Sequence, residues 1–244
     1  MSVVRAPAKL TRSLRVVGRR DDGYHLIDAE MVTLDLADTL SVEASGRTTL
    51  TMSGPFAHDV PTDESNLVMR ALASVSRMAE VHVDKQIPTG GGLGGGSADA
   101  AAILRWAGVD DPDVAVGLGA DVPFCLVGGR ARVTGIGEIV DPLPSLDWTV
   151  TLVVPPLRVS TPAVYRAWDD LDGPRADGPN DLEPAALLVE PRLAQFRDRI
   201  RALSGQRPTL AGSGSTWFVE GKRDDALGAL CDEGATVIVC RAAP

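Results

Sequence analysis

The sequence predicts an α+β protein in two parts, a larger sheet-containing part over residues 1–147 and a smaller part over residues 148–244. Three observations lead to this prediction. Short segments rich in β-branched residues follow one another in the first fifty residues, separated by turn residues. A glycine-rich segment in the middle of the first part runs into an alanine-rich segment. After residue 147, strand-like and helix-like segments alternate as in a split βαβ layer.

The first part opens with strands and continues with a helix. Alternating β-branched residues, interrupted by Gly, Asp and Ser, predict strands at Ser13–Val17, Glu30–Leu36, Thr39–Ala44 and Thr48–Met52. Apolar residues from Leu67 to Val75 fall on one face, which predicts a helix over Ser65–Ala79 that is capped by Ser65. The rest of this part is predicted as a strand at Val81–Ile87, a helix at Ser97–Trp106, and strands at Val122–Val127 and Ala131–Thr134.

The second part begins with an apolar strand at Trp148–Val154 and a helix at Pro162–Leu171. A loop rich in Gly, Pro and Asp follows. The remaining segments are predicted, in order, as helices at Leu182–Val189 and Arg192–Leu203, a strand at Ser215–Val219, a helix at Asp224–Cys231 and a strand at Thr236–Cys240.

Composition narrows the possible partners. The chain of 244 residues has a formal net charge of -9, so its surface repels phosphate backbones and anionic lipids, and we expect neither nucleic acid nor a membrane as partner. No segment approaches the roughly 20 apolar residues that span a bilayer, and the first residues lack a signal peptide's apolar run. Three scattered cysteines fit a reducing cytoplasm. A small-molecule ligand is expected, with the chain as a monomer or homodimer.

The segment Pro88–Ala102 predicts a phosphate-binding loop. Six of the seven residues from Gly90 to Gly96 are glycine, which would be costly in a helix or strand because glycine loses much backbone freedom on ordering. A strand before the loop and a helix after it would direct backbone N–H groups and a helix N-terminus at an anion. The alternative is a flexible surface loop, but the flanking elements favour binding of a diphosphate or triphosphate, as in ATP-dependent phosphoryl transfer.

Two other kinds of phosphate loop fit poorly. A Walker loop ends in Gly-Lys-Ser/Thr, and this sequence has no lysine between Lys85 and Lys222. A dinucleotide-binding fold places its glycine-rich turn near the start of a βαβ unit. Here about ninety residues, mostly β structure of antiparallel type, precede the loop, so we reject that alternative as well.

Three separated motifs resemble those of the GHMP kinases, the superfamily of galactokinase, homoserine kinase and mevalonate kinase. They are Ala6–Lys9, the glycine-rich loop and Leu210–Ser215. Within that superfamily, four further segments resemble the branch whose members phosphorylate a cytidine diphosphate-linked methylerythritol on the non-mevalonate route to isoprenoids. These segments are Gly18–His25, Gly119–Phe124, Gly135–Glu138 and Asn180–Glu183.

The resemblance covers nearly the whole chain and implies a two-domain fold, with a C-terminal domain of the ferredoxin-like, split βαβ type. It implies ATP and Mg²⁺ as cofactors, without indicating which side chains hold the metal. It also implies that Asp121 accepts the proton of the substrate hydroxyl and that Lys9 keeps this carboxylate ionised and offsets charge in the transition state. Otherwise Asp121 would be a helix-capping or turn residue and Lys9 a solvated surface lysine.

The resemblance also assigns ligand contacts. Tyr24 and His25 match residues that recognise cytosine, and Tyr165 matches a second aromatic residue on the far side of the base; each tyrosine could instead lie at the rim of a pocket. The expected nucleotide contacts are Asn66, Lys85, Pro88, Gly90, Gly91, Gly92, Leu93, Gly94, Gly95, Gly96 and Ser97. The expected substrate contacts are Tyr24, His25, Thr161, Tyr165, Gly212, Ser213 and Gly214.

Three residues depart from the family pattern. Thr11 stands where the family usually has Asn, Arg12 where an apolar residue is usual, and Ala98 where a second serine follows the loop. A hydroxyl replaces one hydrogen bond of an amide but not two. The departures leave open a divergent GHMP kinase with another alcohol substrate, such as a mevalonate-type or amino-alcohol compound, and a non-catalytic paralogue that only binds ligand.

Overall fold

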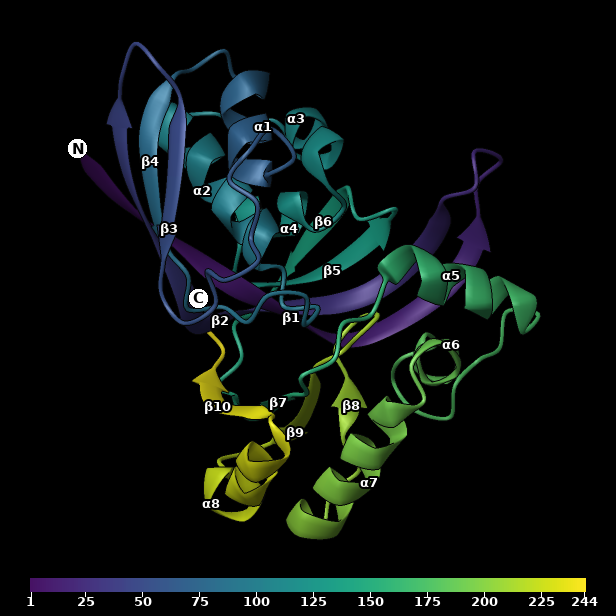
Figure 1. Cartoon of the computed structure of the whole chain (residues 1–244). Coiled ribbons are helices and arrows are strands. Elements are labelled where there is room, and N and C mark those ends of the chain that lie inside the picture. The colour runs from purple at the N-terminus through teal and green to yellow at the C-terminus, as the bar shows by residue number, and fades with distance from the viewer.

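A computed structural model describes residues 1–244 as a six-stranded sheet and a four-stranded sheet, with helices packed against both (Figure 1). Strands β1 (Ser2–Arg19) and β2 (His25–Ala44) form one long antiparallel hairpin, whose register runs from Ser2 opposite Val42 to Arg19 opposite His25. The sequence predicts only fragments of these strands. Pairing along the whole length of β2 supplies the backbone hydrogen bonds that local β propensity alone does not predict.

The first sheet has the order β3-β4-β2-β5-β6, and β1 pairs with the other edge of β2. It is a mixed sheet, because β3 and β4 are parallel while the other pairs are antiparallel. Four helices, α1 to α4, lie together over one face of the sheet (Figure 1). The bounds are β3 (Thr49–Ser53), α1 (Leu67–Ser74), β4 (Ala79–Asp84), α2 (Gly95–Ala107), α3 (Pro112–Leu118), α4 (Val122–Val127), β5 (Arg130–Gly135) and β6 (Ile139–Leu143).

The second sheet confirms the split βαβ prediction. Its four strands occur in the chain as β7, β8, β9 and β10, and their order in the antiparallel sheet is β10-β7-β9-β8. Helices α5 to α7 separate the first two strands, and α8 with a 3₁₀ turn separates the last two. The bounds are β7 (Thr149–Val154), α5 (Thr161–Asp170), α6 (Glu183–Val189), α7 (Arg192–Ser204), β8 (Thr209–Leu210), β9 (Trp217–Glu220), α8 (Asp224–Leu227), the 3₁₀ turn (Gly228–Glu233) and β10 (Thr236–Arg241).

The hydrophobic core runs across both sheets. One buried cluster contains Leu10 of β1 together with Leu152 of β7, and a second contains Leu14 of β1 together with Trp217 of β9. None of the helices has the length and apolar character needed to cross a membrane. The division of the chain into residues 1–147 and 148–244 remains a prediction.

One predicted strand is wrong, since Val122–Val127 forms helix α4. Pro123 lies in its first turn, where a missing N–H costs no hydrogen bond, and Gly128 follows its last residue. Val122 and Phe124 are fully buried. A short apolar run that is buried on most sides lacks the periodicity that distinguishes a helix from a strand.

The predicted cap and end of the first helix also need correction. Asn66, not Ser65, is the N-cap of α1, because its side-chain oxygen accepts a hydrogen bond of 2.8 Å from the N–H of Val68. The helix ends at Ser74, and Ala79 already belongs to β4. Both Ser and Asn are common at N-caps, so the sequence alone did not separate these neighbours.

The glycine-rich loop is packed tightly against the rest of the protein. Gly92 has a φ of +78°, and a Cβ atom there would lie 2.7 Å from the carbonyl oxygen of Ala211 and 2.9 Å from that of Gly214. Gly94 has a φ of +70°, and a Cβ atom there would lie 2.7 Å from Cγ of Lys9. Both positions therefore require glycine for conformation and for space.

We predict that Gly92→Ala lowers the free energy of unfolding by about 2 kcal/mol or more, because it adds left-handed strain to a clash with two carbonyl groups. Chemical denaturation would measure the change. Gly117→Ala is the matched control: Gly117 lies in α3 with open space around its Cα, so the same substitution should stabilise by about 0.5–1 kcal/mol. Equal stabilities of wild type and Gly92→Ala would contradict the tight packing.

Candidate active site

The glycine-rich loop supplies unpaired donors at the start of α2. No backbone N–H group from Gly90 to Ser97 donates a hydrogen bond within the protein. The N-cap of α2 is Gly94, which has no side chain to satisfy the first turn. A row of free N–H groups at a helix N-terminus attracts anions, and phosphate groups suit it well.

A cavity of about 270 Å³ lies over this loop. Every residue predicted to contact the nucleotide lines this cavity. These lining residues are Asn66, Lys85, Pro88, Gly90, Gly91, Gly92, Leu93, Gly94, Gly95, Gly96 and Ser97.

Two of these lining residues have side chains that are already bound to the protein. The Asn66 side chain caps α1 and donates a hydrogen bond of 2.7 Å to the carbonyl oxygen of Pro61. The Lys85 ammonium is buried and forms ion pairs with Asp38 and with Asp99, the latter at 2.7 Å. Asn66 and Lys85 remain predicted nucleotide contacts, but the polar groups of both side chains already have partners within the protein.

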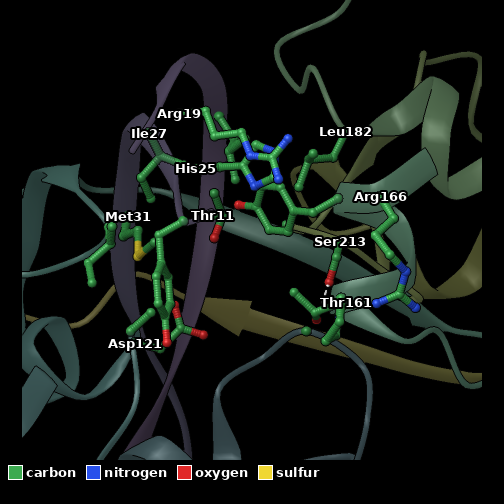
Figure 2. Close-up of a pocket in the computed structure, with 18 of the residues that line it drawn as sticks. Thr11, Arg19, His25, Ile27, Met31, Asp121, Thr161, Arg166, Leu182 and Ser213 are labelled. Atoms are coloured by element: carbon green, nitrogen blue, oxygen red, sulfur yellow. Dashed lines mark hydrogen bonds between the residues drawn. The ribbon is translucent and has the colours of Figure 1, made fainter. Parts of the chain in front are cut away.

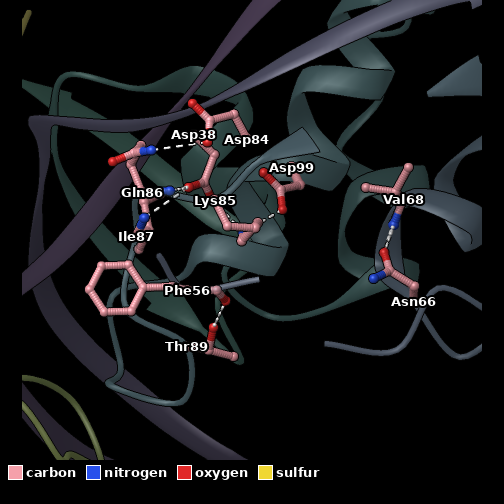
Figure 3. Close-up of polar contacts among 10 residues, drawn as sticks. All are labelled: Asp38, Phe56, Asn66, Val68, Asp84, Lys85, Gln86, Ile87, Thr89 and Asp99. Atoms are coloured by element: carbon pink, nitrogen blue, oxygen red, sulfur yellow. Dashed lines mark hydrogen bonds and ion pairs between the residues drawn. The ribbon is translucent and has the colours of Figure 1, made fainter. Parts of the chain in front are cut away.

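Asp38, Lys85 and Asp99 form a buried network beneath the loop (Figure 3). They come from β2, from the residue after β4 and from the second turn of α2. Asp38 also accepts hydrogen bonds from the N–H groups of Gln86 and Ile87, at 2.5 and 2.8 Å. The network therefore holds both the entry to the glycine-rich loop and the helix that follows it.

Burial raises the pKa of Asp99 to about 7, because the ammonium of Lys85 only partly offsets the loss of water and the nearby Asp38 adds a second negative charge. One oxygen of Asp99 has no hydrogen-bond partner. Burial acts to lower the pKa of Lys85, but the two carboxylates outweigh it and raise that pKa. Lys85 is therefore charged at neutral pH, while Asp99 lies close to its titration point.

A second cavity, of about 510 Å³, lies between β1 and β2, the start of α4, α5 and the loop before β9 (Figure 2). Both predicted catalytic residues and all predicted substrate contacts except Gly214 line this cavity. These residues are Lys9, Tyr24, His25, Asp121, Thr161, Tyr165, Gly212 and Ser213. Gly92 and Ser97 line both cavities, so the two cavities meet at the glycine-rich loop.

Lys9 and Asp121 form an ion pair in the second cavity, with 3.2 Å between Nζ and Oδ2. Lys9 is buried and its Nζ also donates to the Thr11 hydroxyl at 3.2 Å, whereas the Asp121 side chain is 33% exposed. Asp121 occupies the N-cap position of α4 but makes no capping hydrogen bond. Its carboxylate is therefore available to the cavity, unlike that of an ordinary capping aspartate.

The far end of the second cavity is aromatic. The His25 ring stacks on Tyr165, with 4.6 Å between ring centroids, and its Nε2 lies 2.7 Å from Oδ1 of Asp169. Arg19 pairs with the other oxygen of Asp169 at 3.3 Å. Tyr24 is 58% exposed at the rim. His25 therefore covers one face of the Tyr165 ring. A base could stack on that face only if His25 moved; otherwise it would have to stack on the opposite face of Tyr165.

The loop from Gly212 to Gly214 lies beside the Lys9–Asp121 pair. A Cβ atom at Gly212 would lie 3.8 Å from Nζ of Lys9. The hydroxyl groups of Ser213 and Thr161 are 2.7 Å apart, which links the loop to the start of α5. The buried Asn180 donates to the carbonyl oxygens of Leu210 and Gly212, at 2.9 and 2.7 Å, and so fixes the loop from behind.

The three departures from the family pattern have different surroundings. Thr11 lines the second cavity and accepts from Lys9. Arg12 lines neither of these two cavities; it forms an ion pair with Glu30, lies 4.8 Å from the ring centroid of Trp148 and faces a separate cavity beside that ring. Ala98 is fully buried in the core. Of the three departures, only Thr11 therefore changes the wall of the two cavities that meet at the glycine-rich loop.

Several residues at the site escaped prediction. Asp38 and Asp99 accompany Lys85, and Arg19, Arg166 and Asp169 line the second cavity. Two sequence signals were available. A carboxylate inside the alanine-rich helix at Asp99 is unusual for a buried helix, and Thr161, Tyr165 and Asp169 repeat at four-residue spacing along one helix face.

The fold and the two cavities define a small-molecule kinase of the GHMP class, with a glycine-rich loop where the two cavities meet. The family model for the GHMP kinases N terminal domain matches residues 66–109. A homoserine kinase from Cytophaga hutchinsonii shares the fold, with a TM-score of 0.63 at 15% identity over 100% of this chain and 95% of that chain.

Other relatives are much more similar. A 4-diphosphocytidyl-2-C-methyl-D-erythritol kinase from Paracoccus denitrificans is 40% identical over 87% of this chain and 84% of its own length. One from Jannaschia sp. is 41% identical over 87% and 86%. A crystal structure of 4-(cytidine 5'-diphospho)-2C-methyl-D-erythritol kinase has a TM-score of 0.79 at 34% identity, covering 99% of this chain and 100% of that chain. This chain belongs to the family of 4-diphosphocytidyl-2-C-methyl-D-erythritol kinases.

We predict that Asp99→Asn changes how stability depends on pH. A carboxyl group with a raised folded-state pKa stabilises the fold below its ordinary value near 3.8, and this stability is lost as pH rises through about 7. An amide does not ionise and keeps its stability. The free energy of unfolding of the variant relative to wild type should therefore increase between pH 4 and pH 8.

Denaturation at several pH values would measure this difference. Asp232→Asn is the control, because Asp232 is exposed and forms no ion pair. The difference for Asp99→Asn should change with pH more than the difference for this control, and the same pH dependence in both variants would contradict the raised pKa of Asp99.

Proposed function

We propose that this protein transfers the γ-phosphoryl group of ATP to the 2-hydroxyl group of 4-diphosphocytidyl-2-C-methyl-D-erythritol, in the non-mevalonate isoprenoid pathway. The observation that carries the proposal is that the two cavities meet at Gly92 and Ser97, in a site that includes the Lys9–Asp121 ion pair. Phosphoryl transfer needs the donor and the acceptor in line across one point, and this arrangement supports it.

In the proposed reaction, Asp121 accepts the proton of the substrate hydroxyl while that oxygen forms a bond to the γ-phosphorus. The bond from the γ-phosphorus to its bridging oxygen breaks, and ADP leaves with those electrons. Lys9 keeps Asp121 ionised and offsets the negative charge that develops. The free N–H groups from Gly90 to Ser97 hold the phosphates of ATP without a lysine.

We propose Mg²⁺ as the accompanying ion. The chain has no cluster of three or more His, Cys, Asp or Glu side chains that could hold a metal by themselves. This fits Mg²⁺, which keeps several waters and binds chiefly through substrate phosphates with one or two protein oxygens. The Ser97 hydroxyl, at the junction of the cavities, is the protein group that we assign to it. When bound, the ion neutralises phosphate charge.

At the other end of the cavity, we assign Tyr24, His25 and Tyr165 to the cytosine base. Burial raises the pKa of the Tyr165 hydroxyl, which stays protonated. Aromatic rings stack on any base, so the choice of cytosine must come from hydrogen bonds to its edge. The three cysteines form no disulfide, which supports our proposal of a cytoplasmic enzyme.

The function is tested by ADP release with Mg-ATP and a panel of alcohols. We expect turnover with 4-diphosphocytidyl-2-C-methyl-D-erythritol and little with homoserine or mevalonate, because these lack the cytidine group that the aromatic end would bind. Turnover of another alcohol in preference would indicate a divergent kinase. Ligand binding by calorimetry with no ADP release at high enzyme concentration would indicate a non-catalytic binding protein.

We predict that Asp121→Asn lowers kcat by about 10²- to 10⁴-fold, the range expected for loss of a general base. The KM values for ATP and substrate should change only a few-fold, since the amide occupies the same space. Steady-state kinetics would measure both. Asp110→Asn, at an exposed position outside both cavities, should leave kcat unchanged. Full activity of the Asp121 variant would exclude the assigned role.

A further inference from the structure

Helix α5 forms one wall of the second cavity, which the proposed function assigns to the substrate. Thr161, Pro162, Tyr165, Arg166 and Asp169 line the cavity, and their spacing places them on one face of the helix. A helix rises about 1.5 Å per residue, so the wall extends about 12 Å from Thr161 to Asp169. The two ends of this wall belong to different parts of the site.

Thr161 marks the catalytic end. Its hydroxyl lies 2.7 Å from that of Ser213, and the neighbouring Gly212 is close to the Lys9 ammonium. Asp169 marks the aromatic end, because it contacts His25 at 2.7 Å. Arg166 lies between them, about 7–8 Å along the helix axis from Thr161 and about 4–5 Å from Asp169.

Arg166 also differs from the other cations of the cavity in having no partner. Lys9 pairs with Asp121 and Arg19 pairs with Asp169. Arg166 is exposed and forms no ion pair and no side-chain hydrogen bond with any residue of the chain. In Figure 2 it lies on the same side of the cavity as Thr161 and Ser213, across from Asp121 and Thr11. An unpaired guanidinium in an acidic protein is suited to an anionic ligand.

We propose that Arg166 binds the diphosphate group of the substrate. This inference rests on the proposed function, because that substrate carries its diphosphate between the base and the reacting alcohol. The diphosphate must therefore pass the middle of α5 when the base is at His25 and the alcohol is at Asp121. A guanidinium donates two parallel hydrogen bonds to phosphate oxygens, and the long side chain of arginine reaches a ligand that a shorter one would not.

The test compares ligands that differ only in their phosphates. Calorimetry measures the affinities of cytidine, CMP and CDP for protein whose nucleotide site is saturated with a non-hydrolysable ATP analogue. In the wild type, CDP should bind more tightly than cytidine. In Arg166→Met, the affinity for CDP should fall by about 10- to 100-fold, the usual worth of a hydrogen bond to a charged group, while that for cytidine stays within about two-fold. Arg166→Lys should lie between, because it keeps the charge without the paired donors.

Arg201→Met is the matched control. Arg201 is an exposed arginine in the last turn of α7, outside the cavities and without an ion pair, so its replacement should leave all three affinities unchanged. Kinetics supply a second readout, in which Arg166→Met raises KM for the substrate and leaves KM for ATP and kcat nearly unchanged.

Two different failures are distinguishable. If the wild type binds neither cytidine nor CDP, the proposed substrate is wrong and the inference falls with it. If the wild type prefers CDP and Arg166→Met keeps the same ratio of CDP to cytidine affinity, the proposed function stands and the role of Arg166 is excluded. An increase in KM for ATP alone would likewise exclude the assignment.

Discussion

The active site depends on the close packing of Lys9 against the glycine-rich loop. The N–H group of Lys9 donates to the carbonyl oxygen of Leu93 at 3.0 Å, and its side chain fills the space that the missing Cβ atom of Gly94 leaves open. One residue of β1 therefore holds the loop and also presents its ammonium to Asp121. The distance between the glycine-rich loop and the Lys9–Asp121 ion pair is consequently set by contacts with the backbone. Such contacts are more rigid than contacts that depend on side-chain rotamers alone.

Strand β1 carries this constraint to the rest of the molecule. Beyond Lys9, Leu14 forms hydrogen bonds of 2.9 Å with Pro179 and with Asp181, on either side of Asn180. Asn180 in turn holds the loop that contains Gly212. The same strand thus positions Lys9, a proposed catalytic residue on one sheet, and the Gly212–Gly214 loop, a proposed substrate contact attached to the other sheet. This explains why each of the two core clusters draws residues from both sheets.

The sequence predicts those parts of the site whose residues are close together in the chain. It does not predict contacts between residues that are far apart in the chain. The glycine-rich loop and its helix lie within twenty consecutive residues, Pro88–Ala107, and their pattern predicts a phosphate site without any tertiary information. The partners of Lys85 lie 47 and 14 residues away, in elements whose pairing no local pattern indicates. The prediction of a strand at Val122–Val127 was wrong for a related reason. Burial of helix α4 on most sides leaves its sequence without the periodicity that would identify a helix. Asp121 was predicted only through family resemblance, since it lies in no distinctive local pattern.

The distribution of charge explains how an acidic protein can bind a polyanion. The chain has a net charge of -9 and only three lysines. Lys9 is paired with Asp121, and Lys85 is paired with two carboxylates beneath the loop, where it compensates negative charge that would otherwise repel a phosphate. The third, Lys222, lies in neither cavity. With no unpaired lysine in either cavity, the proposed site holds the phosphates of ATP through backbone N–H groups, the N-terminus of α2 and Mg²⁺, none of which requires a basic surface. Such a site attracts anions only at short range, which suits a small nucleotide.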